Sequence, residues 1–233
     1  MSGKDLILQN PLKRLGYESE DILSKGGVGA VLARAGVGKT ALIVQFALNM
    51  LLKKRSVLHI SLNDSVKKVS LWYDEVLRNI ATHYEIEPMK LLKSDILKHR
   101  LIMTFKTADF SFQKLEKRLA ELKDQRIFFP EMILIDGLEF DETVKQNLVQ
   151  LESLAKIHSL CVWFAVRTHR HEKPASDGIP AQLSGIDERF EVIIQLLPEE
   201  KNIRLKVLKG KHSDLDDYTL FLDPATMLLK GSG

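Results

Sequence analysis

The sequence predicts an α/β fold in which helices cover both faces of a mainly parallel β-sheet, with an antiparallel extension at the C-terminal end. Two observations support this expectation. As far as Val166, short apolar runs alternate with amphipathic helical segments, and this alternation is typical of a parallel sheet that is covered on both faces. Beyond Val166, apolar runs follow one another through short polar connections, which indicates antiparallel strands.

Length and composition fit one globular domain. The chain has 233 residues, of which 45% are hydrophobic, so it can bury one sizeable core. We expect residues 26–230 to form this single core domain, because no internal repeat or low-complexity block divides them. The mixed stretch 1–25, which contains Pro11 and Gly16, is expected to be an N-terminal arm with a short helix.

Charge and cysteine content limit the partners and the compartment. The formal net charge of +3 is too small by itself to indicate nucleic-acid binding. The lone Cys161 lies in an apolar run, which favours a buried core residue and a reducing compartment. The N-terminus lacks the apolar centre of a signal peptide, and no run approaches the roughly 18 apolar residues of a membrane span. We therefore expect a cytoplasmic protein without a membrane partner.

The first part of the chain is predicted as strand, helix, strand, helix, helix, strand. The apolar run 28–32 predicts the first strand. Apolar residues at helical spacing then predict a helix over 41–52, up to the basic cluster 53–55, whose charge suits a helix C-terminus. A second strand, two amphipathic helices and a short buried strand follow. In order, these four segments are 57–62, 65–84, 86–99 and 101–105.

The second part continues the alternation and then changes to strands. Ser111 is expected to cap a helix over 112–126, because its hydroxyl can accept a hydrogen bond from a free backbone N–H of the first turn. Pro130 closes the connection after this helix. A strand, a helix, a strand, a polar connection and three further strands are expected next. In order, these are 132–136, 142–158, 160–166, 168–184, 190–197, 203–208 and 218–222.

A phosphate-binding loop is predicted between the first strand and the first helix. In such a loop small residues let backbone N–H groups surround a triphosphate, a lysine reaches the β and γ phosphates, and a hydroxyl residue holds Mg²⁺. The first glycine of the pattern is replaced by alanine, which we interpret as a tolerated methyl group. The alternative is a chance Gly-Lys-Thr before an ordinary helix. The residues expected to bind ATP are Ala33, Arg34, Ala35, Gly36, Val37, Gly38, Lys39, Thr40 and Ala41.

A second motif predicts a metal site beside this loop. Met132 to Asp136 is an apolar run that ends in a carboxylate, as a Walker B strand does. Asp136 and Thr40 are expected to hold Mg²⁺, which bridges the phosphate oxygens. Alone, the same pattern also fits an ordinary strand followed by a turn. In combination with the phosphate loop, it predicts that the cofactors are ATP and Mg²⁺.

From Val28 to Leu229 the chain resembles the RecA-like ATPases, in particular the branch that contains the clock protein KaiC and the replicative helicase DnaB. Besides the two motifs, the segments 61–65, 166–170, 182–195 and 207–212 carry the resemblance. They are similar to the strand end with a catalytic glutamate, the phosphate-sensing strand, the segment that re-enters the sheet, and the element that reaches a neighbouring subunit's γ-phosphate. The resemblance implies a RecA-like fold, ATP hydrolysis and a homo-oligomer.

The residues that would act on the γ-phosphate differ from the family pattern. Asn63 stands where the resemblance places the activating glutamate, and an amide cannot take a proton from water. Asp64 is the obvious substitute, but it lies one position further along and is one methylene shorter. Lys211, two positions after Lys209, stands at the finger position without the planar fork of arginine. Arg167 is either a sensor within the same subunit or an ordinary surface arginine. Slow hydrolysis, or none, is therefore expected.

Other features leave alternatives open. The connection 168–184 begins with basic residues, yet it lacks an aromatic residue for stacking, so a solvated connection is favoured over nucleic-acid binding. His169 and His171 do not have the spacing of a zinc site. Within 65–84, a stripe of apolar residues at helical spacing predicts core packing or, in part, a partner surface. The stripe comprises Leu71, Trp72, Val76, Leu77, Ile80 and Tyr84.

The leading hypothesis is a RecA-like protein that binds Mg·ATP, hydrolyses it slowly and assembles through its nucleotide site. The alternative is a regulatory module that binds nucleotide without hydrolysing it and so exposes or hides the helix of Trp72. A DNA-binding recombinase-like or helicase-like ATPase and a small-molecule kinase are weaker alternatives.

Overall fold

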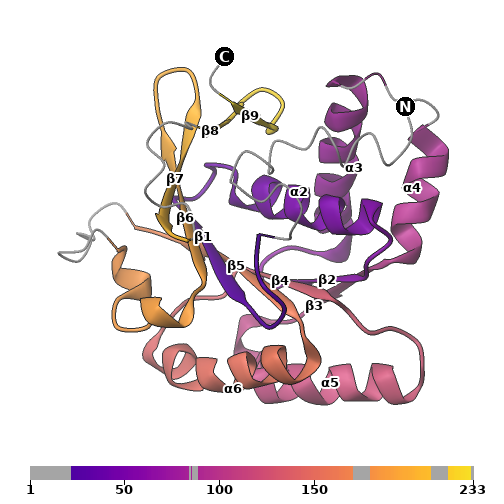
Figure 1. The fold of residues 1–233 in the computed structure, drawn as a ribbon, viewed down its shortest axis with the longest axis vertical. Helices are drawn as coiled ribbons and strands as arrows, with labels where there is room; N and C mark the ends of the chain where they lie inside the picture. Colours follow the sequence, from indigo (N-terminus) through magenta and orange to yellow (C-terminus); the bar gives the residue numbers. More distant parts are fainter. Residues whose placement is uncertain (1–21, 84, 86–88, 170–178, 211–219, 232–233) are drawn as a thin grey trace.

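The computed structural model describes residues 22–83, 85, 89–169, 179–210 and 220–231. These residues form a nine-stranded sheet with helices on both faces (Figure 1). The strand order is β3-β2-β4-β5-β1-β6-β7-β8-β9. The strands are β1 Val28–Ala33, β2 Val57–Ser61, β3 Arg100–Thr104, β4 Met132–Asp136, β5 Cys161–Arg167, β6 Val192–Pro198, β7 Ile203–Lys209, β8 Leu220–Leu222 and β9 Leu229–Gly231.

The pairing confirms a mainly parallel sheet with an antiparallel C-terminal extension. β1 pairs in parallel with β5 and β6, β4 with β5 and β2, and β2 with β3. β7, β8 and β9 are added in antiparallel pairs. The parallel strands end at the same edge of the sheet, and ligands of open α/β sheets bind outside that edge.

Helices cover the two faces in separate groups (Figure 1). α2, α3 and α4 lie on one face, where side chains of α2 and α3 share a core with Val31, Leu134 and Trp163 of the sheet. α5 and α6 lie on the other face and pack with Ala30 and Ile133. The helices are α2 Lys39–Leu52, α3 Val66–His83, α4 Met89–Lys98, α5 Phe112–Asp124 and α6 Glu142–His158, with short 3₁₀ turns η2 Thr107–Asp109, η3 Ala181–Leu183 and η4 Asp187–Arg189.

Local sequence explains where several elements begin and end. Ser111 caps α5 as expected, because its side chain accepts a hydrogen bond from the backbone N–H of Lys114. Asp141 caps α6 in the same way through the N–H of Val144. The central strands are continuous apolar runs because helices bury both of their faces.

The strand expected over 190–197 runs in a different direction from the one expected. We expected it to belong to the antiparallel tail, but β6 lies parallel to β1, with Gly29 opposite Val192. The connection from β5 is long enough to bring the chain back to the edge of the sheet where the parallel strands begin. The described part of this connection contains η3 and η4. The antiparallel extension therefore starts one strand later, at β7.

Two further strands differ from expectation. The run 101–105 was expected to be buried, but β3 is an edge strand of the sheet and its residues are at most partly buried. Strand β9 was not predicted, because three residues that include Gly231 carry too little apolar pattern to be recognised.

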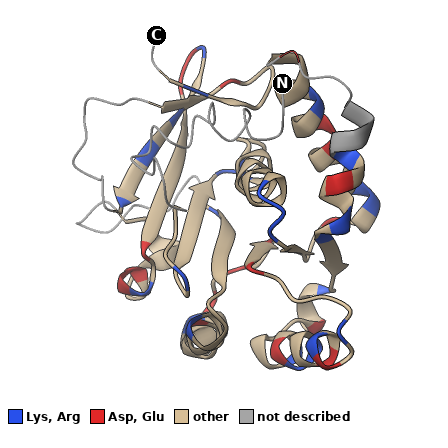
Figure 2. Ribbon diagram, turned by 45° about the vertical axis from the view of Figure 1, so that its right-hand side comes forward, with Lys and Arg blue, Asp and Glu red and all other residues tan. Residues whose placement is uncertain are grey.

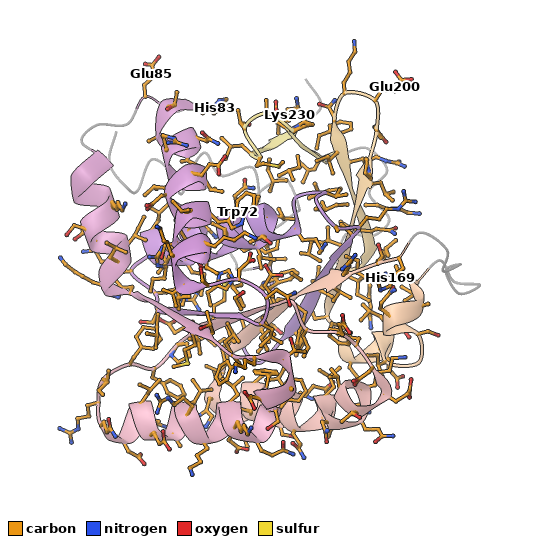
Figure 3. All side chains as sticks on the ribbon, turned by 180° about the vertical axis from the view of Figure 1, so that it is seen from behind. Trp72, His83, Glu85, His169, Glu200 and Lys230 are labelled. Atoms are coloured by element: carbon orange, nitrogen blue, oxygen red, sulfur yellow. The ribbon has the colours of Figure 1, made fainter. Side chains whose placement is uncertain are left out.

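The apolar stripe of α3 is divided between core and solvent. Val76 and Leu77 are buried, and Ile80 is partly buried against the core shared with α2. Trp72 also packs partly buried against this core (Figure 3). Leu71 is 57% exposed. The core interpretation is thus wrong for Leu71, and Tyr84 lies outside the described residues. Tyr73, which the stripe left out, is buried beneath the helix.

Burial of Cys161 is confirmed, because this side chain is 1% exposed. Ile22 and Leu23, at the end of the expected N-terminal arm, are also buried. The rest of the arm, including its expected short helix, lies outside the described residues.

Charged residues of both signs are interspersed on the outer helices (Figure 2). No helix of the described residues combines the length and the apolar character needed to cross a membrane.

Candidate functional site

Four strand ends bring the predicted site residues together at the carboxyl edge of the sheet. Ala33, the last residue of β1, lies opposite Arg167 of β5. Asp136, the last residue of β4, lies opposite Ser61 of β2 on one side and Ala165 on the other. The phosphate loop, the segment after β2 and the loop after β4 therefore leave the sheet side by side.

Two glycines of the predicted phosphate loop adopt left-handed backbone conformations. Gly36 and Gly38 have positive φ angles of 78° and 103°, which side chains rarely adopt. Gly38 is also the N-cap of α2 and supplies no side chain to its free N–H groups, which leaves them available to an anion. Arg34 and Ala35 are exposed, whereas Ala33 is buried and Val37 packs partly buried against the core. Ala41 follows in the buried part of α2.

Close packing holds Gly38 from the side of the C-terminal strands. A Cβ atom at Gly38 would stand 2.6 Å from Cδ2 of Leu222 and 3.3 Å from Sδ of Met227. Leu222 ends β8, and Met227 precedes β9. The turn between the last two strands therefore buttresses the loop.

Lys39 lies over the phosphate loop. Its Nζ donates hydrogen bonds to the carbonyl oxygens of Ala33 at 2.9 Å and Arg34 at 3.0 Å. Burial lowers the pKa of Lys39; the Asp136 carboxylate opposes this shift, and the positive charge of Arg167 adds to it. Arg167 is exposed but close enough to act on Lys39 electrostatically.

Thr40 and Asp136 meet directly. The hydroxyl of Thr40 donates to Oδ2 of Asp136 at 2.7 Å, across 96 positions of sequence. Burial raises the pKa of Asp136, and the Thr40 hydrogen bond and the Lys39 charge act against that rise. A hydroxyl and a carboxylate fit Mg²⁺, which commonly takes one or two carboxylates and completes its shell with phosphate and water oxygens. No group of three or more His, Cys, Asp and Glu residues in the described chain could hold a metal by itself.

Asn63 and Asp64 follow β2 next to this pair. The N–H of Leu62 donates to the carbonyl oxygen of Asp136 at 2.9 Å, which ties the two strand ends together. Asn63 is exposed, and its amide lies against Gly137, where a Cβ atom would stand 2.5 Å from Nδ2. Asp64 is partly buried and raises the pKa of Asp136 through its negative charge.

The residues expected to act between subunits have different outcomes. Lys209 ends β7, and its Nζ donates to the carbonyl oxygen of Asp187 in the same chain at 2.9 Å. Lys211 lies outside the described residues, as do Arg170 and His171. His169 is exposed just beyond β5, beside the short helical turns (Figure 3).

A cavity of about 400 Å³ opens beside the end of β5. Arg167 and His169 line it together with the acidic residues Glu139 and Asp141. Because both signs of charge line this cavity, it does not have the uniformly positive character of a nucleic-acid groove.

Sequence reasoning missed two residues of this region. Lys68 forms an ion pair with Asp64 at 2.7 Å, and its spacing of four residues on a helix start could have indicated the pair. Gln45 of α2 is buried. Its side-chain amide donates a hydrogen bond to the carbonyl oxygen of Met227 and accepts one from the N–H of Leu229. A glutamine among apolar helix residues is a visible signal, but its partners 182 and 184 positions away are not.

No protein-family model matches this chain, and a search of curated proteins returns no match to it either.

Proposed function

We propose that this protein binds Mg·ATP at the phosphate loop and is a RecA-like, KaiC-related ATPase of low activity. The contact between Thr40 and Asp136, at 2.7 Å, carries the proposal. It joins the hydroxyl of the loop to the carboxylate of β4 beside the Lys39 ammonium, and these are the groups that a bound Mg·triphosphate requires. The described strand order, with β5 between β1 and β4, is compatible with a RecA-like fold.

Lys39 would exchange its carbonyl partners for phosphate oxygens when ATP binds. Its Nζ already lies over the loop, bonded to Ala33 and Arg34. Burial lowers the pKa of Lys39, and the Asp136 carboxylate acts against this shift because it stabilises the ammonium form. Thr40 and Asp136 would share Mg²⁺, which neutralises phosphate charge.

Titration calorimetry with ATP, with and without Mg²⁺, tests nucleotide binding. Lys39→Ala should weaken binding by about 10- to 100-fold, because a charged hydrogen-bond donor to phosphate is lost. Thr40→Val should abolish most of the gain that Mg²⁺ gives, because valine keeps the shape and removes the ligand oxygen. Thr82→Val, at an exposed position of α3, is the matched control and should bind as the unchanged protein does. Failure of the unchanged protein to bind Mg·ATP would refute the proposal.

Hydrolysis would place water in line with the γ-phosphate next to the end of β2. Asp64 or Asn63 would position this water, and Lys209 or Lys211 of a neighbouring subunit would stabilise the developing charge. Of Asn63 and Asp64, only Asp64 has a carboxylate that can take a proton from water, and one of its oxygens already forms an ion pair with Lys68. Both features support slow turnover.

A second candidate is a nucleotide-dependent regulatory module without hydrolysis. The amide of Asn63, in place of a carboxylate, favours it. Phosphate release measured beside ATP affinity separates the candidates, since tight binding without release at high protein concentration would leave only the regulatory module. Asn63→Glu should raise turnover if position 63 is the activating position, and unchanged turnover would exclude that role.

A further inference from the structure

An ion pair engages the carboxylate of Asp64, which is proposed to position the attacking water. Nζ of Lys68 lies 2.7 Å from Oδ1 of Asp64. The pair spans the start of α3, with Asp64 just before the helix and Lys68 in its first turn. The Lys68 side chain is 62% exposed and that of Asp64 is 23% exposed, so the contact is partly open to solvent.

The backbone of Asp64 is fixed from the other side. Its N–H donates to the hydroxyl of Ser61 at 3.0 Å, and Ser61 is 3% exposed at the end of β2. Ser61 lies opposite Asp136 in the sheet. The Ser61 hydrogen bond therefore fixes the backbone of Asp64 at the strand end next to Asp136, the proposed metal ligand, and Lys68 engages Oδ1 of its side chain.

We propose that Lys68 is a positioning residue that restrains hydrolysis by holding and neutralising the carboxylate of Asp64. The inference rests on the proposed Mg·ATP site. In hydrolysis, water forms a bond to the γ-phosphorus, and the bond to the β,γ-bridging oxygen breaks with its electron pair leaving on ADP. The proton of the water passes to the Asp64 carboxylate and from there to solvent. An oxygen of Asp64 that accepts a hydrogen bond from the Lys68 ammonium is less available to accept one from this water.

The charges around the pair favour restraint over assistance. Hydrogen bonding to Asp64, followed by the charges of Asp64 and Asp136, raises the pKa of Lys68, so the ammonium remains charged at neutral pH. The pair is exposed, however, and exposed pairs are weak. Removing the ion pair should therefore lower the activation barrier of hydrolysis only in part. The remaining excess of the barrier is attributed to the side chain of Asp64, which is one methylene shorter than that of glutamate.

The test compares steady-state phosphate release by four proteins. Lys68→Met should raise kcat about two- to fivefold with KM unchanged, because an exposed ion pair opens at a small cost. Lys68→Arg, which retains the pair, should behave as the unchanged protein does. Lys67→Met is the matched control: Lys67 is the neighbouring exposed lysine, and no ion pair of it is found within the described residues. Its kcat should not change.

A double variant tests the route of the effect. In an Asp64→Asn background, Lys68→Met should give no increase, because the group that Lys68 restrains is gone. Unchanged or lower kcat in Lys68→Met, or an increase that persists in the Asp64→Asn background, would overturn the inference. ATP affinity measured in the same proteins separates the two proposals: loss of Mg·ATP binding in the unchanged protein overturns both, whereas normal binding with an unresponsive kcat overturns this one alone.

Discussion

At the scale of single residues, His59 is a histidine held neutral inside the sheet. It lies on β2 with no exposed surface, and its Nδ1 is 3.2 Å from the hydroxyl oxygen of Tyr73. No described residue provides a hydrogen-bond partner for Nε2. Burial first, and then the positive charge of Arg100, lower the pKa of His59 from 6.5 to about 3, while Asp64 opposes the shift.

This pKa makes stability depend on pH. In the unfolded chain His59 takes up a proton at about pH 6.5, whereas in the folded protein it stays neutral down to about pH 3. Between these values acid favours the unfolded state, so His59 alone should lower the free energy of unfolding by about 2 kcal/mol from about pH 7.5 to about pH 5. His59→Gln, which retains a polar partner for Tyr73, should remove this part of the dependence. Urea unfolding at both pH values measures it, and an equal pH effect in the variant would contradict the prediction.

Gly137 should be sensitive to substitution for two separate reasons. Its φ angle is +88°, and a Cβ atom would stand 2.5 Å from Nδ2 of Asn63. Gly185 has a similar φ angle of +77° but nothing within 4 Å of its Cβ position. Gly185→Ala should therefore cost about 1–2 kcal/mol of stability from backbone strain alone. Gly137→Ala should cost more, because Asn63 must also move.

Denaturant unfolding of the two glycine variants isolates the contact between the ends of β2 and β4. Equal losses in Gly137→Ala and Gly185→Ala would mean that Asn63 adapts freely to the added methyl group. A larger loss at Gly137 would show that Asn63 is held in place beside Asp136.

At the scale of elements, Gln45 links the phosphate-loop helix to the C-terminal strands. Its Nε2 donates to the carbonyl oxygen of Met227 at 2.8 Å, and its Oε1 accepts from the N–H of Leu229 at 3.0 Å. Gln45→Leu keeps the volume but leaves these backbone groups without partners, so stability should fall by about 1–3 kcal/mol. Hydrogen exchange at the Leu229 amide should accelerate.

The exposed Gln150 of α6 supplies the control for this prediction. Gln150→Leu should leave exchange at Leu229 unchanged. Because Leu222 and Met227 pack against Gly38, the Gln45 variant should also bind Mg·ATP less tightly. Normal exchange at Leu229 in Gln45→Leu would show that apolar packing alone holds the last strands.

The same elements explain how far the sequence determines the fold. Strands such as β4 and helices such as α5 could be predicted, because apolar periodicity and the Ser111 cap act within one segment. The direction of β6 could not, because it depends on which edge a connection of more than twenty residues returns to. The entropy cost of closing a loop grows only slowly with its length, so a short return and a long return of the chain differ little in free energy. The sequence of the connection therefore does not indicate whether β6 runs parallel or antiparallel to β1.

For the candidate site, the local motifs were predictable and the contacts between them were not. Gly36 to Thr40 and Asp136 stand out because each chemistry requires a fixed residue type at a fixed spacing. The Gln45 side chain forms hydrogen bonds with backbone groups of Met227 and Leu229, which only the folded sheet brings close to α2. The packing of Asn63 on Gly137 likewise depends on the register of β2 and β4.

At the scale of the whole molecule, the proposed assembly would allow Lys209 of one subunit to complete the site of another. Lys209 bonds the carbonyl oxygen of Asp187 in its own chain, so action on a neighbour's phosphate would require this bond to exchange. If assembly drives that exchange, sedimentation velocity should detect larger species with a non-hydrolysable Mg·ATP analogue than without it. The same size in both conditions would argue against a role in trans.

Mixed subunits provide the decisive measurement. Lys39→Ala subunits should bind ATP much more weakly but still present Lys209, whereas Lys209→Met subunits should bind ATP but lack the proposed charge. Each variant alone should hydrolyse ATP more slowly than the unchanged protein, and their mixture should recover part of the activity, because only the mixture combines a filled site with an intact neighbouring lysine. Lys206→Met, at an exposed position of the same strand, is the control and should retain full activity by itself. A mixture no faster than the mean of its two components would assign the Lys209 effect to its own chain, where the bond to Asp187 holds η4 against β7.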